Sequence, residues 1–244
     1  MRFTDKICVV TGGTSGIGRA TCVRLAAEGG TVVALGRDRA EGAETVRLIT
    51  KAGGQAMFMP CDLAKPRAIT TTVTKVLANY QRVDVLVCDA AMMTFETVRD
   101  LPLPKWDELM LVNLRSVVQL TQLCLPHMPQ GSAIVAISSV HAHQTTANVV
   151  PYATSKGGLE AFVRGLSMEL DRRHTRVNAV APGAVDTPML WSNPNVKNGT
   201  EKIDKATVGT PEELAAAIVF LASAEASFVH GTTLVVDGGR LAQL

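Results

Sequence analysis

A tyrosine and a lysine stand four residues apart in a segment whose pattern predicts a helix, so both side chains project from one face. They are Tyr152 and Lys156, within the predicted helix 151–170. A phenol with its reference pKa of about 10 is a poor base, but a nearby ammonium group favours the phenolate and is expected to lower that pKa. Such a phenol can exchange a proton with an alcohol or carbonyl during hydride transfer. The alternative is a surface pair on an amphipathic helix.

A glycine-rich turn, residues 11–18 (TGGTSGIG), separates the first predicted strand from the first predicted helix. Glycines permit a tight turn and close approach of a phosphate, and the helix N-terminus then offers free N–H groups to a pyrophosphate. The spacing is G-x-x-x-G-x-G, not the general G-x-G-x-x-G, and no P-loop Gly-Lys follows. The turn predicts a dinucleotide site; the alternative is a flexible turn without a ligand.

Strand and helix patterns alternate along the whole chain, and the strands are apolar throughout. Continuous apolar strands between helices are typical of a parallel sheet covered on both faces. We therefore predict a single α/β domain over residues 1–244, a doubly wound, Rossmann-like, three-layer αβα fold with about seven strands. The predicted strands are 7–10, 31–35, 56–59, 83–88, 133–137, 176–180 and 232–236, and the helices 17–27, 39–52, 65–79, 104–127, 151–170 and 211–222.

Together these segments resemble the short-chain dehydrogenase/reductase family. The resemblance covers essentially the full chain, because the matching segments recur in the expected order. They are residues 11–18, Asp62-Leu63, Asn113, residues 137–139, residues 152–156 (YATSK), residues 178–187 and residues 237–239. The resemblance implies an oxidoreductase that transfers a hydride between a nicotinamide dinucleotide and a small alcohol or ketone.

The resemblance also implies roles for single residues. Tyr152 is the expected general acid/base, Lys156 also binds the nicotinamide ribose, and Asn113 holds a water that links Lys156 to solvent. Ser139, thirteen residues before Tyr152, orients the substrate oxygen and stabilises its developing charge; Ser138 is expected to be structural. The expected cofactor-binding residues are Gly12, Thr14, Ser15, Gly16, Ile17, Gly18, Arg37, Asp62, Leu63, Ala90, Tyr152, Lys156, Val185 and Thr187.

One segment departs from the family pattern, which has Asn-Asn-Ala-Gly after the fourth strand. Here the run is Cys88-Asp89-Ala90-Ala91. Ala90 is retained, so backbone contacts to a cofactor are expected to survive. Ala91 adds a methyl group where glycine would allow an unusual φ, so strain is expected there. Cys88 and Asp89 are interpreted as structural substitutions, with a reactive role as the alternative.

The end of the second strand bears on the choice between NADP and NAD. An acidic residue there would bond the ribose hydroxyls and repel a 2′-phosphate, but the position is Gly36. Arg37 instead offers a guanidinium group suited to a phosphate. We therefore favour NADP(H), with NAD(H) as the alternative because Asp38 could reach the ribose after a small rotation of the turn. Arg37 could also be an ordinary solvated loop charge.

Two segments are expected to shape the substrate pocket: residues 140–150 and the irregular residues 188–209, which we predict to be a mobile lid. The first contains His141 and His143, one expected to contact substrate and the other to be solvated. A metal site is not expected, because no third ligand is evident. Thr187 could cap a helix before Pro188. An apolar wall is expected from Met92, Met93, Met189, Leu190 and Trp191, which could equally be packing or interface residues.

Composition sets the remaining expectations. The net charge is +2, so a nucleic-acid or membrane-surface partner is not expected, and we expect no apolar run of the roughly 18 residues that a membrane span needs. The five cysteines are scattered and form no C-x-x-C pair, which indicates a reducing, cytoplasmic environment.

Charged residues make up only 19% of the chain. With the resemblance, this suggests a homo-oligomer, a tetramer or dimer, formed through helices 104–127 and 151–170.

Two other functions compete with the oxidoreductase. One is an NADP(H)-binding regulator or scaffold without turnover, because a fold does not fix a function. The full set of Asn113, Ser139, Tyr152 and Lys156 argues against a pure binder. The other is a lyase, epimerase or dehalogenating variant, and the glycine turn with Arg37 argues for retention of a dinucleotide.

Overall fold

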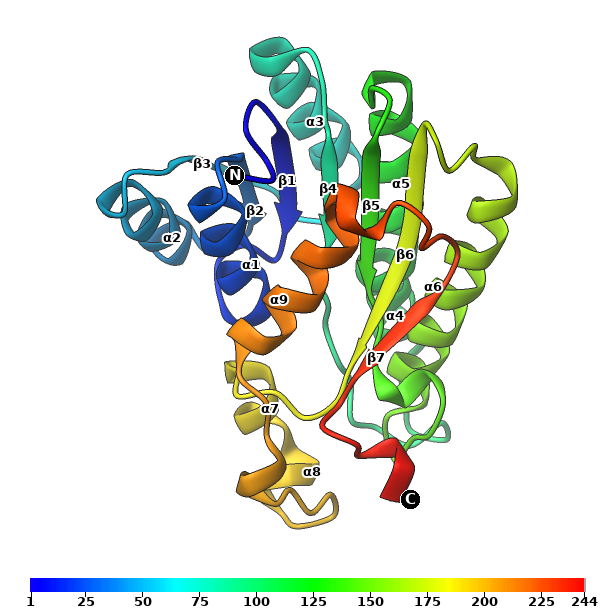
Figure 1. The fold of residues 1–244 in the computed structure, drawn as a ribbon. Coiled ribbons are helices and arrows are strands. Elements are labelled where there is room, and N and C mark those ends of the chain that lie inside the picture. The colour runs from blue at the N-terminus through cyan, green and yellow to red at the C-terminus, as the bar shows by residue number, and fades with distance from the viewer. Residues whose placement is uncertain (244) are drawn as a thin grey trace.

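The computed structural model describes residues 1–243, and these contain a seven-stranded parallel sheet in the order β3-β2-β1-β4-β5-β6-β7 (Figure 1). The predicted doubly wound α/β fold is thereby confirmed. The order runs outward in both directions from β1 and β4, so a crossover lies between them. The strands are β1 (Ile7–Thr11), β2 (Thr31–Gly36), β3 (Gln55–Pro60), β4 (Val85–Cys88), β5 (Ser132–Ile137), β6 (Thr175–Pro182) and β7 (Thr233–Val236).

Helices cover both faces of the sheet. On one face, α1 (Gly16–Ala27), α2 (Arg39–Lys51) and α9 (Pro211–Ala222) bury Leu25, Ile49 and Ile218 against one set of strand residues. The opposite face is covered by α3 (Pro66–Tyr80), α5 (Ser116–Cys124) and α6 (Val150–Glu169). Successive strand residues alternate between the two cores: Val9 packs on one face and Val10 on the other. This alternation explains why the strands are apolar throughout.

The predicted long helix 104–127 is interrupted. It consists of α4 (Leu103–Met110), a π-helical turn (Leu111–Arg115), α5 and a final 3-10 turn (Leu125–His127). By length and a mean hydropathy of 1.2, Leu103–His127 reaches the composition of a membrane-crossing helix, so the expectation of no such run was wrong. Its apolar face packs here against the sheet, with Leu109, Val117 and Leu120 buried.

Several other boundaries also differ from the prediction. β4 begins at Val85, two residues late, whereas β6 extends from Thr175 to Pro182. The irregular segment 188–209 contains two short helices, α7 (Pro188–Ser192) and α8 (Pro194–Lys197), and a 3-10 turn (Lys205–Thr207). Each short helix has proline at its first position, which suits a helix start but gives no apolar periodicity to detect.

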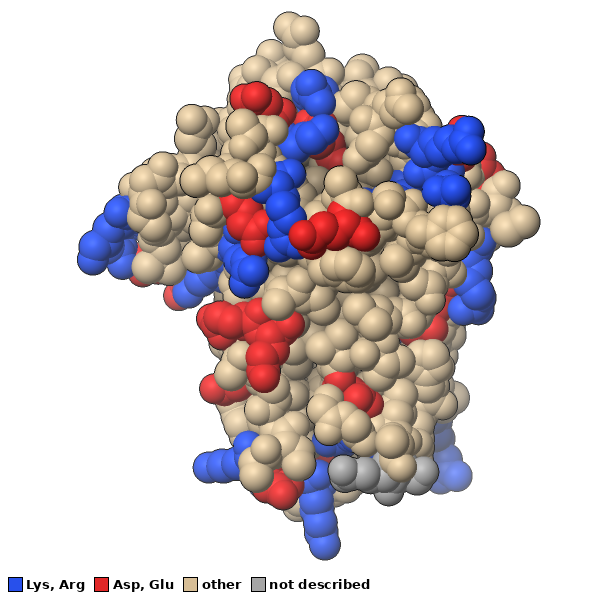
Figure 2. Space-filling view, in the orientation of Figure 1, with Lys and Arg blue, Asp and Glu red and all other residues tan. Residues whose placement is uncertain are grey.

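The surface carries charges of both signs. Figure 2 shows Lys/Arg and Asp/Glu side chains interleaved on the upper part of this face. A group of acidic side chains lies near the start of α9, whose first turn carries Glu212 and Glu213, whereas the area over β7 is largely uncharged. Phe220, Leu234 and Val235 are exposed apolar residues of these two elements.

Candidate active site

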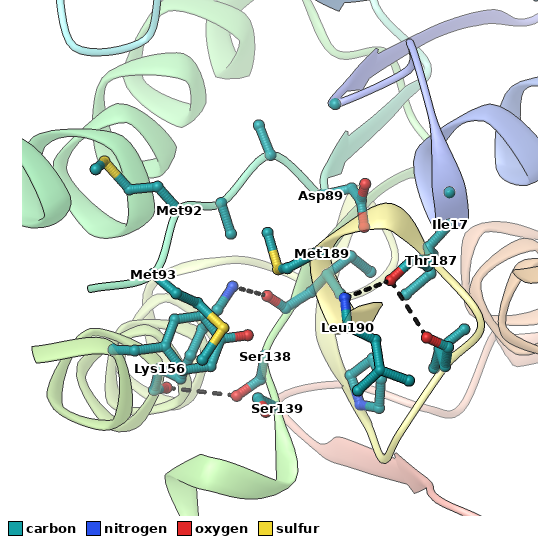
Figure 3. Close-up of a pocket in the computed structure, with 18 of the residues that line it drawn as sticks. Ile17, Asp89, Met92, Met93, Ser138, Ser139, Lys156, Thr187, Met189 and Leu190 are labelled. Carbon is teal, nitrogen blue, oxygen red and sulfur yellow. Dashed lines mark hydrogen bonds between the residues drawn. The ribbon is translucent and has the colours of Figure 1, made fainter. Parts of the chain in front are cut away.

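A cavity of about 460 Å³ lies at the edge of the sheet where the parallel strands end (Figure 3). Its wall is formed by segments that follow β1, β2, β3, β4, β5 and β6, together with the start of α6. Open α/β sheets bind ligands at this edge, beside the point where the strand order reverses. The cavity runs from the glycine turn to Tyr152, and it therefore joins the two halves of the expected site.

The glycine turn has the geometry of a ligand cradle. Gly12 and Gly16 have φ values of +70° and +48°, which lie in a backbone region that residues other than glycine rarely adopt. A Cβ atom at Gly12 would stand 2.9 Å from the Ala90 backbone nitrogen, and one at Gly16 would stand 3.0 Å from Thr187 Cγ2. Bare backbone and the N-terminus of α1 thus face the cavity, which fits a pyrophosphate.

Gly18 is placed differently from the other turn residues. It is not part of the cavity wall; it packs against the turn itself, and a Cβ atom there would overlap the Gly12 carbonyl oxygen. Its role is to let α1 approach β1 closely. The other expected residues of the turn, Gly12, Thr14, Ser15, Gly16 and Ile17, line the cavity.

The expected adenine end of the cavity is formed after β2 and β3. Arg37, Asp62 and Leu63 all line it. The Asp62 carboxylate lies 3.2 Å from Lys65 Nζ, and its Oδ1 accepts a hydrogen bond from the Ala64 backbone N–H. Arg37 is exposed. These three residues come from two neighbouring strand ends, as the sequence predicted.

Tyr152 and Lys156 lie together on the face of α6 that packs toward the sheet. Their side chains are 7% and 2% exposed, and Lys156 Nζ lies 5.5 Å from the centre of the Tyr152 ring. Lys156 Nζ donates a hydrogen bond of 2.6 Å to the Ile137 carbonyl oxygen at the end of β5. The helix is held in this orientation because its buried residues recur at helical spacing, with Leu159 and Val163 following.

Ser139 is the second residue after β5, and it lies in the wall beside Tyr152. Its backbone is extended, and its Oγ accepts a hydrogen bond from the His141 N–H that starts a 3-10 turn. The neighbouring Ser138 is turned differently: its Oγ donates to Glu160 Oε1 at 2.7 Å. Of the two serines, Ser139 is the one whose hydroxyl is not committed to a buried carboxylate.

Burial dominates the protonation of the two groups on α6. It raises the pKa of Tyr152 to about 12, although the Ser139 hydroxyl acts in the opposite direction. Burial also lowers the pKa of Lys156 to about 8, although Asp89 and Cys88 act to raise it. The expected lowering of the phenol pKa by the ammonium group was therefore wrong for this structure. Loss of water around the phenolate outweighs the cation, which is directed at the Ile137 carbonyl.

Asn113 does not reach the cavity wall. It is buried in the π-helical turn, where its Nδ2 donates to the Met92 carbonyl and to Ser155 Oγ, at 2.9 and 3.1 Å. Its Oδ1 accepts from the Met92 N–H at 2.8 Å. The amide thus ties the segment after β4 to α6. Its expected water-holding role stays a prediction.

The segments after β4 and β6 complete the wall around the turn. Ala90 and Val185 line the cavity, and the Ala90 and Asp89 N–H groups both donate to Thr11 Oγ1. Thr187 caps α7 by accepting from the Leu190 N–H. Thr187 also lines the cavity, so one residue can both cap α7 and contact a cofactor.

The expected strain at Ala91 is not present. Within residues 1–243, the non-glycine residues with positive φ are Asp5, Gln81 and Asn148. Ala91 therefore keeps a backbone conformation that any residue adopts, and the methyl group needs no special accommodation.

A polar wall near Tyr152 was only partly anticipated. The His141 ring packs edge-on against Tyr152 with 5.8 Å between ring centres, whereas His143 is partly exposed beside Glu160. Glu201 and Arg240 also line the cavity and form an ion pair of 2.9 Å. Arg240 was missed, because its position depends on the path of the chain after β7, for which the local sequence carries no signal.

The apolar part of the wall agrees with expectation. Figure 3 shows Met92 and Met93 on one side of the cavity and Thr187 and Leu190 on the other. Met189 also contributes to the wall, whereas Trp191 points away and donates to Asp186 Oδ1 at 2.6 Å.

Known proteins resemble the whole chain. A family model described as enoyl-(acyl carrier protein) reductase matches residues 12–240. Cyclopentanol dehydrogenase from Comamonas sp. is 34% identical over 247 aligned residues, which cover 99% of each protein. The 3-oxoacyl-(acyl-carrier-protein) reductase of Thermotoga maritima is 35% identical, with 98% of this chain and 99% of the relative covered.

Solved structures agree with this assignment. The structure of a short chain dehydrogenase from Burkholderia cenocepacia in complex with NADP has a TM-score of 0.91 and 30% identity, with 98% of each chain covered. The protein is thus an NAD(P)-dependent oxidoreductase, and it belongs to the short-chain dehydrogenase/reductase family.

Proposed function

We propose that this protein is a reductase that transfers a hydride from NADPH to a small ketone with an apolar body, with Tyr152 as general acid. One observation carries the proposal. Tyr152, Ser139 and Lys156 converge at one end of a cavity whose other end is the glycine turn. A nicotinamide dinucleotide that spans this cavity supplies the hydride, and the three side chains supply the groups that act on the substrate oxygen.

Each side chain has a distinct task. A phenol with a pKa of about 12 is protonated at neutral pH, which is the form that donates a proton to a carbonyl oxygen. The Ser139 hydroxyl offers a second hydrogen bond to the same oxygen as negative charge develops on it. Lys156 supplies positive charge within 5.5 Å of the phenol ring, and this charge favours loss of the phenolic proton during the reaction.

An absorbance assay tests the activity directly. The protein is incubated with NADPH and a panel of small ketones, and with NADP and the matching alcohols, while the reduced-nicotinamide band is followed. We expect consumption of NADPH with at least one ketone. Binding of NADPH without turnover across the panel would instead support a regulator or scaffold.

Three features support NADP(H) over NAD(H). Arg37 lines the cavity at the expected ribose position, and its guanidinium group suits a 2′-phosphate. A Cβ atom at Gly36 would stand 2.5 Å from Thr14 Cγ2, so the acidic side chain that would select NAD could be placed there only if Thr14 moved. Asp38, the competing carboxylate, accepts a hydrogen bond from the Glu41 N–H as the cap of α2.

Replacement of Arg37 by alanine is expected to weaken the preference for NADPH. A hydrogen bond to a charged group contributes about 1.5–3 kcal/mol, and because Arg37 is exposed we expect the low end, about a tenfold fall in the NADPH-to-NADH ratio of kcat/KM. Steady-state kinetics with both cofactors measures the ratio. Arg39→Ala, two residues along and also exposed, is the matched control and should leave it unchanged. An unchanged ratio in Arg37→Ala would remove the basis for the NADP assignment.

We further propose that residues 188–209 form a lid that closes over the cofactor and substrate. Its support is that Pro188, Met189, Leu190, Asn193 and Glu201 all line the cavity, while α7 buries none of its residues and α8 buries only Asn195. The apolar wall of Met92, Met93 and Leu190 suits a substrate with a hydrocarbon body.

Trp191 provides a reporter of lid closure. The chain has two tryptophans, Trp106 and Trp191, so Trp106→Phe leaves a single emitter on the lid. Trp191 is 37% exposed. Closure is expected to change its exposure, and its emission maximum should shift when NADPH and a substrate or inhibitor are both present. The emission of Trp191→Phe, which keeps Trp106, should shift little. An unchanged Trp191 spectrum in the ternary complex would contradict the lid.

A further inference from the structure

Asp89 places a carboxyl group inside the glycine turn. Its Oδ2 lies 2.8 Å from the point where a Cβ atom of Gly12 would stand and 2.7 Å from that of Gly18. The Asp89 N–H donates to Thr11 Oγ1 at 3.1 Å, so the backbone is fixed at the end of β4. The carboxyl group therefore fills the space that these two glycines leave, and Asp89 forms part of the cavity wall.

A second oxygen also lies near the Cβ position of Gly18. The Gly12 carbonyl oxygen lies even closer than Asp89 Oδ2 to the Cβ position of Gly18. The Gly18 N–H donates to the Asp89 carboxyl group and favours its ionised form, whereas the Gly12 carbonyl oxygen is an acceptor and offers that form no hydrogen bond. A neutral carboxylic acid has an O–H to donate, whereas a carboxylate has none. The turn therefore presents one hydrogen-bond donor and one acceptor to a buried carboxyl group.

A bound ligand would favour the neutral acid. A dinucleotide brings its pyrophosphate to the glycine turn and the N-terminus of α1, the elements that enclose the carboxyl group. Like charges in a site with little water repel strongly, and such repulsion favours the neutral form of an acid. Occupation of the turn by phosphate and ionisation of Asp89 therefore oppose each other.

The charged and titratable groups around Asp89 come from three elements. Lys156 of α6 is the cation that opposes protonation of Asp89. Tyr152 of α6 is affected by the charge of Asp89, and burial keeps it protonated. Burial also raises the pKa values of Cys22 on α1 and Cys88 on β4, so both remain neutral thiols. Burial raises the pKa of Asp89 to about 7 against the effects of Lys156 and the Gly18 N–H.

We infer that Asp89 is a proton-binding part of the cofactor site, and that binding of the dinucleotide takes up one proton from solvent onto this carboxyl group. The inference rests on dinucleotide binding at the turn and goes beyond it, because it assigns a function to the residue at which the chain departs from its family. The affinity for the dinucleotide should then be constant below pH 7 and fall above it, by up to about tenfold for each pH unit.

Binding measurements on the apoprotein test this without turnover. Dissociation constants for NADPH and NADH are measured by nicotinamide fluorescence from pH 5.5 to 9, in wild type and in Asp89→Asn, which keeps the shape but cannot ionise. Both cofactors are used because a 2′-phosphate itself titrates near pH 6, to judge by the second pKa of about 6 of phosphate esters. Between pH 6.5 and 8.5 wild type should lose about tenfold more affinity than Asp89→Asn. Any pH dependence of affinity that remains in Asp89→Asn is assigned to the titration of Lys156.

Asp62→Asn is the matched control. It removes another carboxylate of the same cavity, one already paired with Lys65, and it should retain the wild-type slope whatever its absolute affinity. Equal slopes in wild type and Asp89→Asn would overturn the inference while leaving cofactor binding intact. Binding of neither cofactor at any pH would overturn it together with the proposed function.

The inference does not depend on the folding of one variant. Titration calorimetry on wild type at pH 8, in two buffers with different ionisation enthalpies, counts the protons taken up on binding. A count near one supports the inference, and a count near zero contradicts it. Asp89→Ser provides a second variant without an ionisable group, and its proton count should be lower than that of wild type by about one proton.

Discussion

Replacement of Tyr152 by phenylalanine is expected to lower kcat by about 10²- to 10⁴-fold, the contribution of a positioned general acid. The change removes one hydroxyl group and keeps the ring, which packs edge-on against His141 and beside Lys156. The fold and the cavity should therefore be retained. The dissociation constant for NADPH should change by no more than about tenfold, the effect of one neutral hydrogen bond. Stopped assays for kcat and fluorescence titration for binding separate the two quantities.

The chain contains a matched control for this experiment. Tyr80 is its second tyrosine, and it lies at the end of α3 with its hydroxyl 3.4 Å from Met57 Sδ, away from the cavity. Tyr80→Phe should leave both kcat and cofactor binding unchanged. A Tyr152→Phe protein with kcat close to wild type would exclude the phenol as the proton donor and leave Ser139 as the remaining hydroxyl candidate.

The order of elements could be predicted from the sequence because each strand is continuously apolar and each main helix repeats at helical spacing. Boundaries were less accessible. The π-helical turn at Leu111–Arg115 has no sequence signature, and it places Asn113 behind the cavity wall where its amide bonds Met92 and Ser155. The predicted continuous helix 104–127 contained no such turn, and it therefore gave no indication of the direction in which the Asn113 amide points.

The cavity was predictable where it is built from local motifs and less so where distant segments meet. The glycine turn and the Tyr152–Lys156 pair each lie within a few residues, so spacing alone brings their groups together. Glu201 and Arg240 are 39 residues apart and meet only because residues 188–209 and the segment after β7 return to the same place. The pKa of Tyr152 was expected to fall because only its charged neighbour was considered; burial, which dominates, is a property of the folded chain.

Replacement of Gly18 by alanine should damage cofactor binding and stability together. The added methyl group would overlap the Gly12 carbonyl oxygen and stand 2.7 Å from Asp89 Oδ2. The first neighbour is backbone and cannot rotate away, so α1 must shift from β1 or the turn must open. Overpacking of this kind costs about 1–3 kcal/mol, and where this cost falls on the ligand-bound turn it corresponds to a roughly 5- to 150-fold larger dissociation constant. Fluorescence titration with NADPH and thermal unfolding of the apoprotein measure the two effects.

Gly165→Ala is the matched control because it makes the same chemical change in a helix where the new Cβ atom meets nothing within 4 Å. Gly165 lies in the middle of α6, and replacement of a helical glycine by alanine stabilises by roughly 0.5–1 kcal/mol. The two variants should therefore shift the melting temperature in opposite directions, and only Gly18→Ala should weaken NADPH binding. If Gly18→Ala binds NADPH as tightly as wild type, close packing of α1 on the turn is not what holds the pyrophosphate site in shape, and the phosphate cradle must depend on Gly12 and Gly16 alone.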